Sequence, residues 1–312
     1  MIMAFQRIVD RVLPDGTSSK VYPFHISLEG MESILLCRDD EDYDHLEKSF
    51  YLSALDCNTL VICEISMSTH GHCAVLATNW VSAFNTGEAV KKRHSQFISY
   101  KYGDRKTLVR SKISVQYLDS DRYVRNALAY IPRNAADTGL RIEDYPWSSY
   151  RAMFTGGDCS SGHRYVATLT RREKEALFRT HKDLSKVPWM VDNRDRIVPA
   201  SACDYKYLES AFFGDQAFFL RTIGEVNPAE MKQQLVQNAR VWQPDSAFLI
   251  TVNNVSQKWY RQDIQDVTLE RKARLIVYLF RCYHTSASQL ARCLRMSRDQ
   301  VSSILADNGI KA

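Results

Sequence analysis

The order of periodic segments in the first 130 residues limits the fold more than any other feature of the chain. Segments that alternate like strands are interleaved with segments that have the apolar period of a helix. The order strand–helix–strand–strand–helix–strand–helix predicts an α+β domain, with helices on an antiparallel sheet in a ferredoxin-like arrangement. Pro23 indicates that the first strand lies at an edge or begins there. The expected strands are 20–28, 59–67, 72–77 and 112–118, and the expected helices are 39–55, 81–100 and 121–130.

The rest of the chain has mainly helical patterns. Loop composition over 155–162 ends the first domain, and we expect helices over 169–183, 203–213 and about 227–241. An amphipathic helix over 270–282 precedes two short helices, the first capped by Thr285 or Ser286 and the second by Ser297. We therefore expect three parts: an α+β domain over 1–155, a helical middle region of unknown role over 156–255, and a mainly helical C-terminal domain over 256–312.

The last two short helices have the spacing of a helix-turn-helix, which places its second helix in the major groove of DNA. Arg298, Gln300 and Ser302 would then lie on the exposed faces of that second helix, available to base edges. The alternative is a plain three-helix bundle that binds nothing.

The 312 residues carry a formal net charge of +5, and the distribution of that charge is more informative than its size. One stretch is rich in cations and contains a single acid, Asp104, with Phe97, Tyr100 and Tyr102 interleaved. Cations with aromatic side chains suit a phosphate backbone with stackable bases, although a solvated helix followed by a basic loop gives the same pattern. The candidate DNA-binding residues here are Lys91, Lys92, Arg93, Lys101, Arg105, Lys106 and Arg110.

Sequence composition also indicates the cellular compartment in which the protein is expected. No run of eighteen apolar residues is present, so we expect no membrane span. The first residues lack the pattern of a signal peptide, and the eight cysteines are scattered with no C-x-x-C pair. We expect a cytoplasmic protein whose cysteines are mostly small core residues.

Two histidines, His70 and His72, flank one residue in an apolar strand segment. Side chains two apart on a strand point to the same face, so the two imidazoles form half of a metal site. Tyr130 and Asn134 are four apart and share one face of a later helix, which can pack beside the central strands. A metal beside a tyrosine hydroxyl is an arrangement for phosphoryl transfer, and the hypothesis is that the chain cuts nucleic acid. The alternative is a pair of satisfied structural histidines.

Several short motifs in this order resemble the single-tyrosine HUH transposases, in particular the REP-associated tyrosine transposases. The resemblance covers about residues 21–150. Its motifs are an early strand, an acidic segment, a strand that ends in a histidine pair, a tyrosine–asparagine helix and a W-S-S-Y ending. In this chain they are Phe24 to Gly30, Arg38 to Asp42, Met67 to His72, Tyr130 to Ala135, and Trp147 to Tyr150.

The resemblance implies that 1–155 is a catalytic domain that nicks and joins single-stranded DNA through a 5′-phosphotyrosine intermediate, as in DNA transposition. By the same resemblance, His70, His72 and Asn134 would bind a divalent metal, and Tyr130 would be the nucleophile. Two imidazole nitrogens and an amide oxygen with open positions suit Mg²⁺ or Mn²⁺. The expected partner is single-stranded or hairpin DNA, and both a monomer and a homodimer fit the resemblance.

Departures from the family pattern favour a rival function. Gly71 stands where the family has a bulky apolar residue, and that side-chain position faces away from the metal. Pro132 lies between Tyr130 and Asn134, where a kink would misplace the third ligand, and Ala135 replaces a family proline. The rival is a catalytically weakened, domesticated regulator that recognises hairpin or single-stranded DNA. A third hypothesis is a metal hydrolase in which water replaces the tyrosine.

Overall fold

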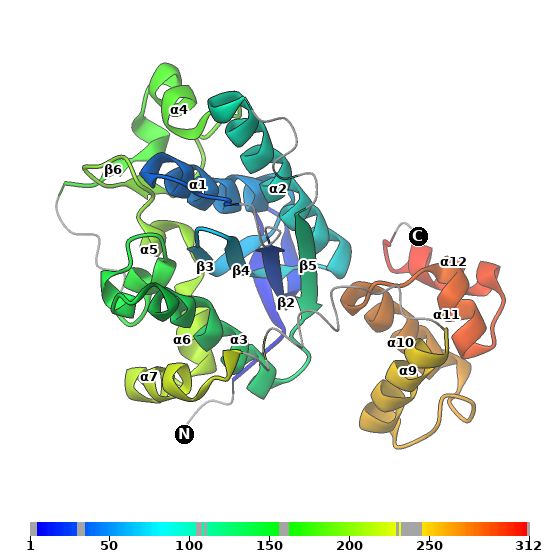
Figure 1. Cartoon of the computed structure of the whole chain (residues 1–312). Coiled ribbons are helices and arrows are strands. Elements are labelled where there is room, and N and C mark those ends of the chain that lie inside the picture. The colour runs from blue at the N-terminus through cyan, green and yellow to red at the C-terminus, as the bar shows by residue number, and fades with distance from the viewer. Residues whose placement is uncertain are drawn as a thin grey trace.

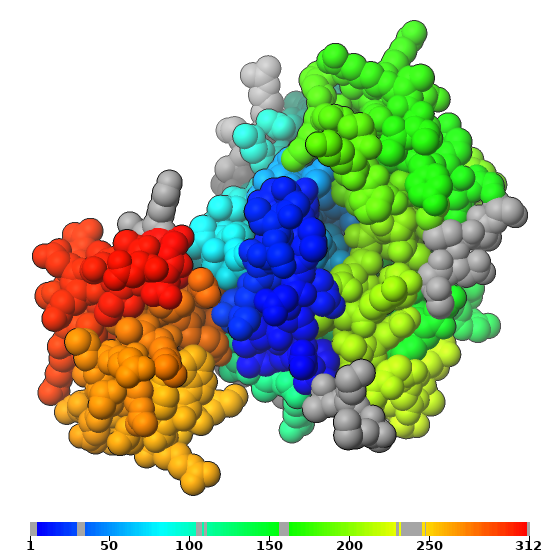
Figure 2. Space-filling view, turned by 180° about the vertical axis from the view of Figure 1, so that it is seen from behind, coloured from blue at the N-terminus to red at the C-terminus, as the bar shows by residue number. Residues whose placement is uncertain are grey.

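An antiparallel sheet with helices on both faces forms the body of the molecule, and a helical lobe follows it at the C-terminus (Figure 1). The computed structural model describes residues 5–29, 35–103, 108, 111–155, 162–228, 231 and 245–310. This architecture confirms the predicted α+β class with a mainly helical C-terminal region. Figure 2 shows the C-terminal helices as a distinct lobe beside the body.

The central strand of the sheet is β2 (Ser18–Glu29). One edge of β2 pairs with β4 (His70–Ala77), which in turn pairs with β3 (Leu60–Ser66). The other edge is shared by β1 (Val9–Val12) and β5 (Lys112–Tyr117), one after the other along its length. All pairings are antiparallel, and the order β5–β2–β4–β3 is the ferredoxin-like order that the sequence predicts.

Pro23 lies in the middle of the central strand, so the prediction that it marks an edge or a start is wrong. The pairing with β1 ends at Val21 and the pairing with β5 begins at Phe24. The Pro23 carbonyl accepts a hydrogen bond from the Leu118 backbone N–H, so its nitrogen faces the same shared edge. Because neither ladder pairs Pro23 at that point, its missing N–H costs the sheet little.

Two helices cover one face of the sheet and a third covers the other. The first face is packed by α1 (Asp40–Asp56) and α2 (Trp80–Tyr102), and the second by α3 (Asp121–Arg133). Ser120 caps α3, since its side chain accepts from the Tyr123 N–H. The two faces of β4 therefore contribute to two separate cores, with Cys73 and Val75 in one and Ala74 and Leu76 in the other.

The middle region completes both cores. The segment around α4 (Arg171–Phe178) and the short strands β6 (Arg164–Tyr165) and β7 (Met190–Val191) pack with α1, through Trp189 and its neighbours. Helices α6 (Tyr205–Ala211) and α7 (Gln216–Glu225) pack against α3. The predicted helix over 169–183 is shorter than expected, because Arg179 adopts a left-handed conformation that ends α4.

Short helices connect these elements. They are α5 (Pro199–Ala202), η1 (Asn134–Thr138), η2 (Ile142–Asp144), η3 (Ser149–Ala152) and η4 (Val166–Thr168). Most of the helix expected over 227–241 lies outside the described residues.

The C-terminal lobe contains α9 (Asp245–Tyr260), α10 (Leu269–Cys282), α11 (Ala287–Leu294) and α12 (Arg298–Asp307) around its own core. Aromatic side chains join it to the body. The rings of Trp80 and His284 stack with centroids 4.3 Å apart, and the Tyr278 hydroxyl donates to the Tyr117 hydroxyl at 3.3 Å. The lobe is thus docked against the start of α2 and the end of β5.

Candidate functional site

The histidine pair on β4 faces α3. Strand alternation places His70 and His72 on that face and Gly71 on the opposite one, where an added Cβ would contact Phe50 and Leu46 of α1. The two imidazole centroids are 5.0 Å apart. His72 is buried, whereas His70 is half-buried at the start of the strand. The structure therefore places both histidines on one face, as their spacing predicts.

Helix α3 brings Tyr130 to the histidines. The Tyr130 ring meets the His72 ring edge-on, with centroids 5.2 Å apart and an interplanar angle of 67°. Tyr130 is fully buried on the sheet side of its helix. The structure thus brings together a phenol and two imidazoles that are about 60 residues apart in sequence.

Pro132 does not displace Asn134 from this group. Pro132 and Asn134 lie at the end of α3, where Asn134 N–H bonds to the carbonyls of Ile131 and Pro132 and the chain continues as a 3₁₀ helix. The Asn134 side-chain amide donates to the carbonyl of Tyr130 at 2.7 Å and to that of Ile131 at 3.2 Å. Because both donations come from Nδ2, Oδ1 is left facing His70, 3.3 Å from its Nε2. Capping the helix end therefore orients the oxygen toward the histidine pair.

A third histidine, His25, belongs to the same cluster, and no pattern in the sequence pointed to it. His25 lies on β2, and its Nε2 is 3.3 Å from His72 Nδ1. Complete burial lowers the pKa of His25 to about 3, so its ring is neutral at pH 7. Alternation from Phe24 indicates its face, but only the register with β4 brings it beside His72. A proton on His72 Nδ1, donated to His25, would leave the lone pair of His72 on Nε2.

The Tyr130 hydroxyl is buried and makes no regular hydrogen bond with any described residue. Burial raises the pKa of Tyr130 to about 12, with Asp137 adding to the rise and the nearby Asn134 side chain opposing it. The phenol is therefore protonated at neutral pH. Because the hydroxyl is buried, a phosphate could contact it only if the protein exposed it.

The spacing of the donors suits one divalent cation. Two ligand atoms at about 2.1 Å from an ion and at a right angle lie roughly 3 Å apart, close to the separation of His70 Nε2 and Asn134 Oδ1. His72 would complete a set of two imidazoles and one amide oxygen. Thr69 Oγ1 lies 3.0 Å from His70 Nδ1 and helps to hold that ring. Within the described ranges, no group of three or more His, Cys, Asp or Glu side chains is arranged to hold a metal.

The cations predicted to bind DNA are mostly engaged within the protein where the structure describes them. Lys91 donates from Nζ to the carbonyl of Ser111 at 2.7 Å, and Arg93 pairs with Asp56. Lys92 is exposed. Three other candidates follow α2 in this basic stretch, and the structure does not describe them: Arg105, Lys106 and Arg110.

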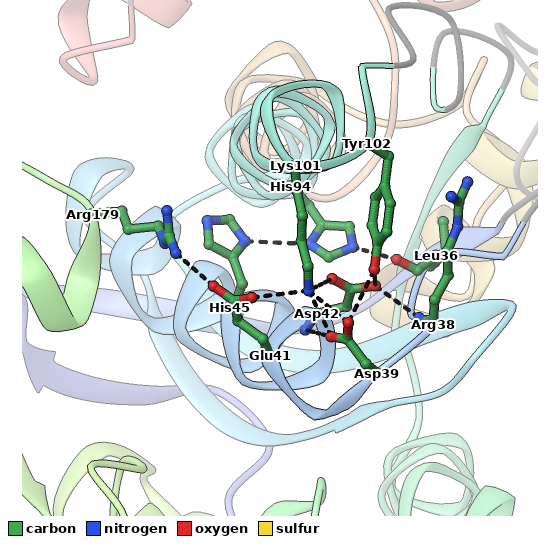
Figure 3. Close-up of polar contacts among 10 residues, drawn as sticks. All are labelled: Leu36, Arg38, Asp39, Glu41, Asp42, His45, His94, Lys101, Tyr102 and Arg179. Carbon is green, nitrogen blue, oxygen red and sulfur yellow. Dashed lines mark hydrogen bonds and ion pairs between the residues drawn. The ribbon is translucent and has the colours of Figure 1, made fainter.

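Lys101 is the centre of an ion-pair network that joins the end of α2 to the start of α1 (Figure 3). Its Nζ lies 2.7 Å from Asp39, 2.9 Å from Glu41 and 2.8 Å from the buried carboxylate of Asp42. The Tyr102 hydroxyl also donates to Asp42 at 2.9 Å. These contacts give Lys101 a structural role in joining the two helices.

The last two helices are separated by a short turn at Arg295, which has a left-handed backbone. Ser286 and Ser297 cap the two helices, as the sequence predicts. Arg298 is exposed and Ser302 is half-exposed, whereas the exposed Gln300 uses its side-chain oxygen to accept from the Ser297 N–H in a capping box. DNA binding by this face remains a prediction.

Comparisons with known proteins add little to this geometry. No protein-family model matches the chain, and no curated protein matches it. Among solved structures, the chain is similar to a REP-associated tyrosine transposase bound to a REP hairpin, with 14% identity and a TM-score of 0.34. The match covers 42% of this chain and 77% of the other. A likeness of this size is too weak to assign a family. Among the described helices, none is long and apolar enough to cross a bilayer.

Proposed function

We propose that this protein is a metal-dependent enzyme that nicks and joins single-stranded DNA, with Tyr130 as the nucleophile, in a transposase-like reaction. The observation that carries the proposal is the meeting of four side chains, two from β4 and two from the end of α3. The Tyr130 ring lies against His72, and the Asn134 oxygen four residues along the helix faces His70. No single segment of the chain contains this arrangement.

In the proposed reaction, His70, His72 and Asn134 would hold a divalent ion, Mg²⁺ or Mn²⁺. Such an ion, when bound, polarises a phosphate and stabilises the charge that develops on it. Tyr130 attacks the phosphorus of a DNA phosphodiester and loses its proton to solvent. The bond to the 3′-oxygen breaks, and that oxygen takes a proton from solvent. The products are a 5′-phosphotyrosine link and a free 3′-hydroxyl, and the reverse attack by a 3′-hydroxyl joins strands. His25, neutral and buried, orients the His72 ring.

The buried state of the Tyr130 hydroxyl favours a second candidate function. A phenol with a pKa raised to about 12 and no exposed surface is a poor nucleophile as it stands. In the second candidate, the protein is a domesticated regulator that binds hairpin or single-stranded DNA without cutting it. The enzyme therefore requires that DNA or metal binding expose Tyr130, and the regulator does not.

An adduct assay separates these candidates. Labelled single-stranded hairpin DNA is incubated with the protein and Mn²⁺, and covalent protein–DNA product is resolved on a denaturing gel. We expect an adduct with the parent protein, none with Tyr130→Phe, and an undiminished adduct with the matched control Tyr100→Phe, because Tyr100 is 84% exposed on α2. Binding without any adduct in the parent protein would support the regulator. Cleavage that survives in Tyr130→Phe would support a hydrolase that uses water.

The C-terminal lobe is proposed to recognise a DNA site through α12. Arg298 is exposed at the start of this helix, where recognition helices contact bases. Arg298→Ala should weaken binding to duplex or hairpin DNA while leaving the adduct yield on saturating short substrate unchanged. Unchanged hairpin affinity would argue for a three-helix bundle without a DNA role.

A further inference from the structure

A groove separates the body from the C-terminal lobe, outside the histidine–tyrosine site. It has a volume of about 610 Å³ and is formed by the end of β5, the first turns of α3, and helices α9 and α10. Sites that hold a small organic ligand have roughly 300–1,000 Å³. The groove is therefore large enough for a nucleotide.

An exposed aromatic ring and two cations line this groove. Trp259 is 40% exposed, and its ring packs on that of Tyr278 with centroids 4.7 Å apart. Arg122 and Lys258 are both exposed, and neither forms an ion pair or hydrogen bond with any residue that the structure describes. One carboxylate, Asp119, also lies in the lining. A supported indole beside two unpaired cations suits a base stacked next to its phosphate.

Polar groups without partners complete the lining. The carboxamides of Asn126 and Asn254 make no hydrogen bond within the described part of the chain. The Tyr123 hydroxyl is buried and lacks a partner among the same residues. A buried hydroxyl without a partner is costly, whereas a ligand with donors and acceptors would satisfy it. Carboxamides are the side chains that read base edges in pairs of hydrogen bonds.

The groove adjoins the histidine–tyrosine site. Gln116, which lines the groove, is the cross-strand partner of His25 on β2. Asn126 precedes Tyr130 by four residues on α3, so the two are neighbours about 6 Å apart along the helix axis. A strand whose phosphate reaches Tyr130 would therefore pass along α3 into the groove.

We infer that this groove binds an unpaired nucleotide of single-stranded DNA next to the phosphate that Tyr130 attacks, with the base stacked on Trp259 and the backbone held by Lys258 and Arg122. The inference rests on the proposed DNA-cutting function for the position of the strand. It gives the C-terminal lobe a second role, which is to contact, through α9, the DNA strand that the first domain cuts.

The test uses the full chain carrying Tyr130→Phe, in EDTA, so that neither metal nor adduct formation affects the result. Affinity for a fluorescent 12-nucleotide single strand is measured by anisotropy with Trp259→Ala and Lys258→Glu. The matched control is Lys206→Glu, because Lys206 is exposed on α6 and makes no ion pair within the described residues. We expect each groove variant to lose affinity about tenfold, and the control to stay within twofold. Melting temperature checks that each variant folds.

Unchanged single-strand affinity in folded Lys258→Glu and Trp259→Ala overturns the inference. So does an equal loss in Lys206→Glu, since the effect would then be one of net charge. If Trp259→Ala fails to fold, Trp259→Leu with Lys258→Glu decides the matter. The outcome is separable from the proposed chemistry. An adduct in the parent protein without a groove effect refutes only the groove, and a groove effect without an adduct refutes only the cutting.

Discussion

Gly71→Ala should destabilise this protein, although a glycine within a strand is ordinarily a weakness. Removing a strand glycine gains about 0.5–1 kcal/mol from the unfolded chain. At position 71, however, the new Cβ would lie 3.0 Å from Phe50 Cζ, 3.5 Å from Leu46 Cδ2 and 3.5 Å from the Ile65 carbonyl oxygen. Phe50 is buried, so its ring must shift within the core to admit the new atom, and overpacking costs about 1–3 kcal/mol. We expect a net loss of about 1 kcal/mol for alanine, and about 3 kcal/mol for leucine.

Urea denaturation followed by circular dichroism measures this change, and two further variants isolate its cause. Gly224→Ala is the matched control, because Gly224 lies in α7 with no atom within 4 Å of an added Cβ. That change should stabilise the protein by up to about 1 kcal/mol. Phe50→Leu opens space, so Gly71→Ala in that background should become neutral or stabilising. If Gly71→Ala stabilises the parent protein, or has the same effect in both backgrounds, the packing argument is wrong.

Three further predictions concern buried polar groups. Burial lowers the pKa of His94 to about 4, so the unfolded chain binds a proton first as pH falls from 6.5. By pH 4 this difference should remove about 3 kcal/mol of unfolding free energy, and the buried His25 adds its own share. His94→Gln should reduce the pH-dependent loss by about 3 kcal/mol, and an unaltered slope would contradict this expectation. Lys101→Met should cost about 2 kcal/mol by leaving buried Asp42 without its cation, with single-strand affinity retained; lost affinity at full stability would instead make Lys101 a DNA contact. Asn134→Asp should cost about 1–3 kcal/mol in EDTA, because a carboxylate cannot donate to the Tyr130 carbonyl; equal stability to the parent would refute the capping role.

Local patterns were sufficient for most elements of the body. The local patterns predicted the sheet, the helices that pack on it and the cap at Ser297, because propensity, period and capping act over a few residues. The short strand β1 and the helices α7 and α9 were not predicted. The placement of Pro23 was missed for a related reason. A proline's cost depends on which strand lies beside it, and that is set by pairing between distant segments.

For the candidate site too, local patterns predicted some features and only the fold showed the others. Strand alternation alone places His70 and His72 on one face, and helical spacing alone places Tyr130 and Asn134 on another. The sequence could not decide whether a kink at Pro132 moves the Asn134 oxygen away from the two histidines. In the fold, the Asn134 amide takes the carbonyl of Tyr130 at the helix end, and its oxygen is thereby turned to His70.

By itself, the sequence determined which side chains share a strand face or a helix face, because those periods are fixed by backbone geometry. Only the tertiary structure decided which faces meet. Register brought His25 to His72, burial closed off the Tyr130 hydroxyl, and acids from another helix engaged Lys101. Such contacts depend on the packing of segments distant in sequence, and no local pattern encodes them.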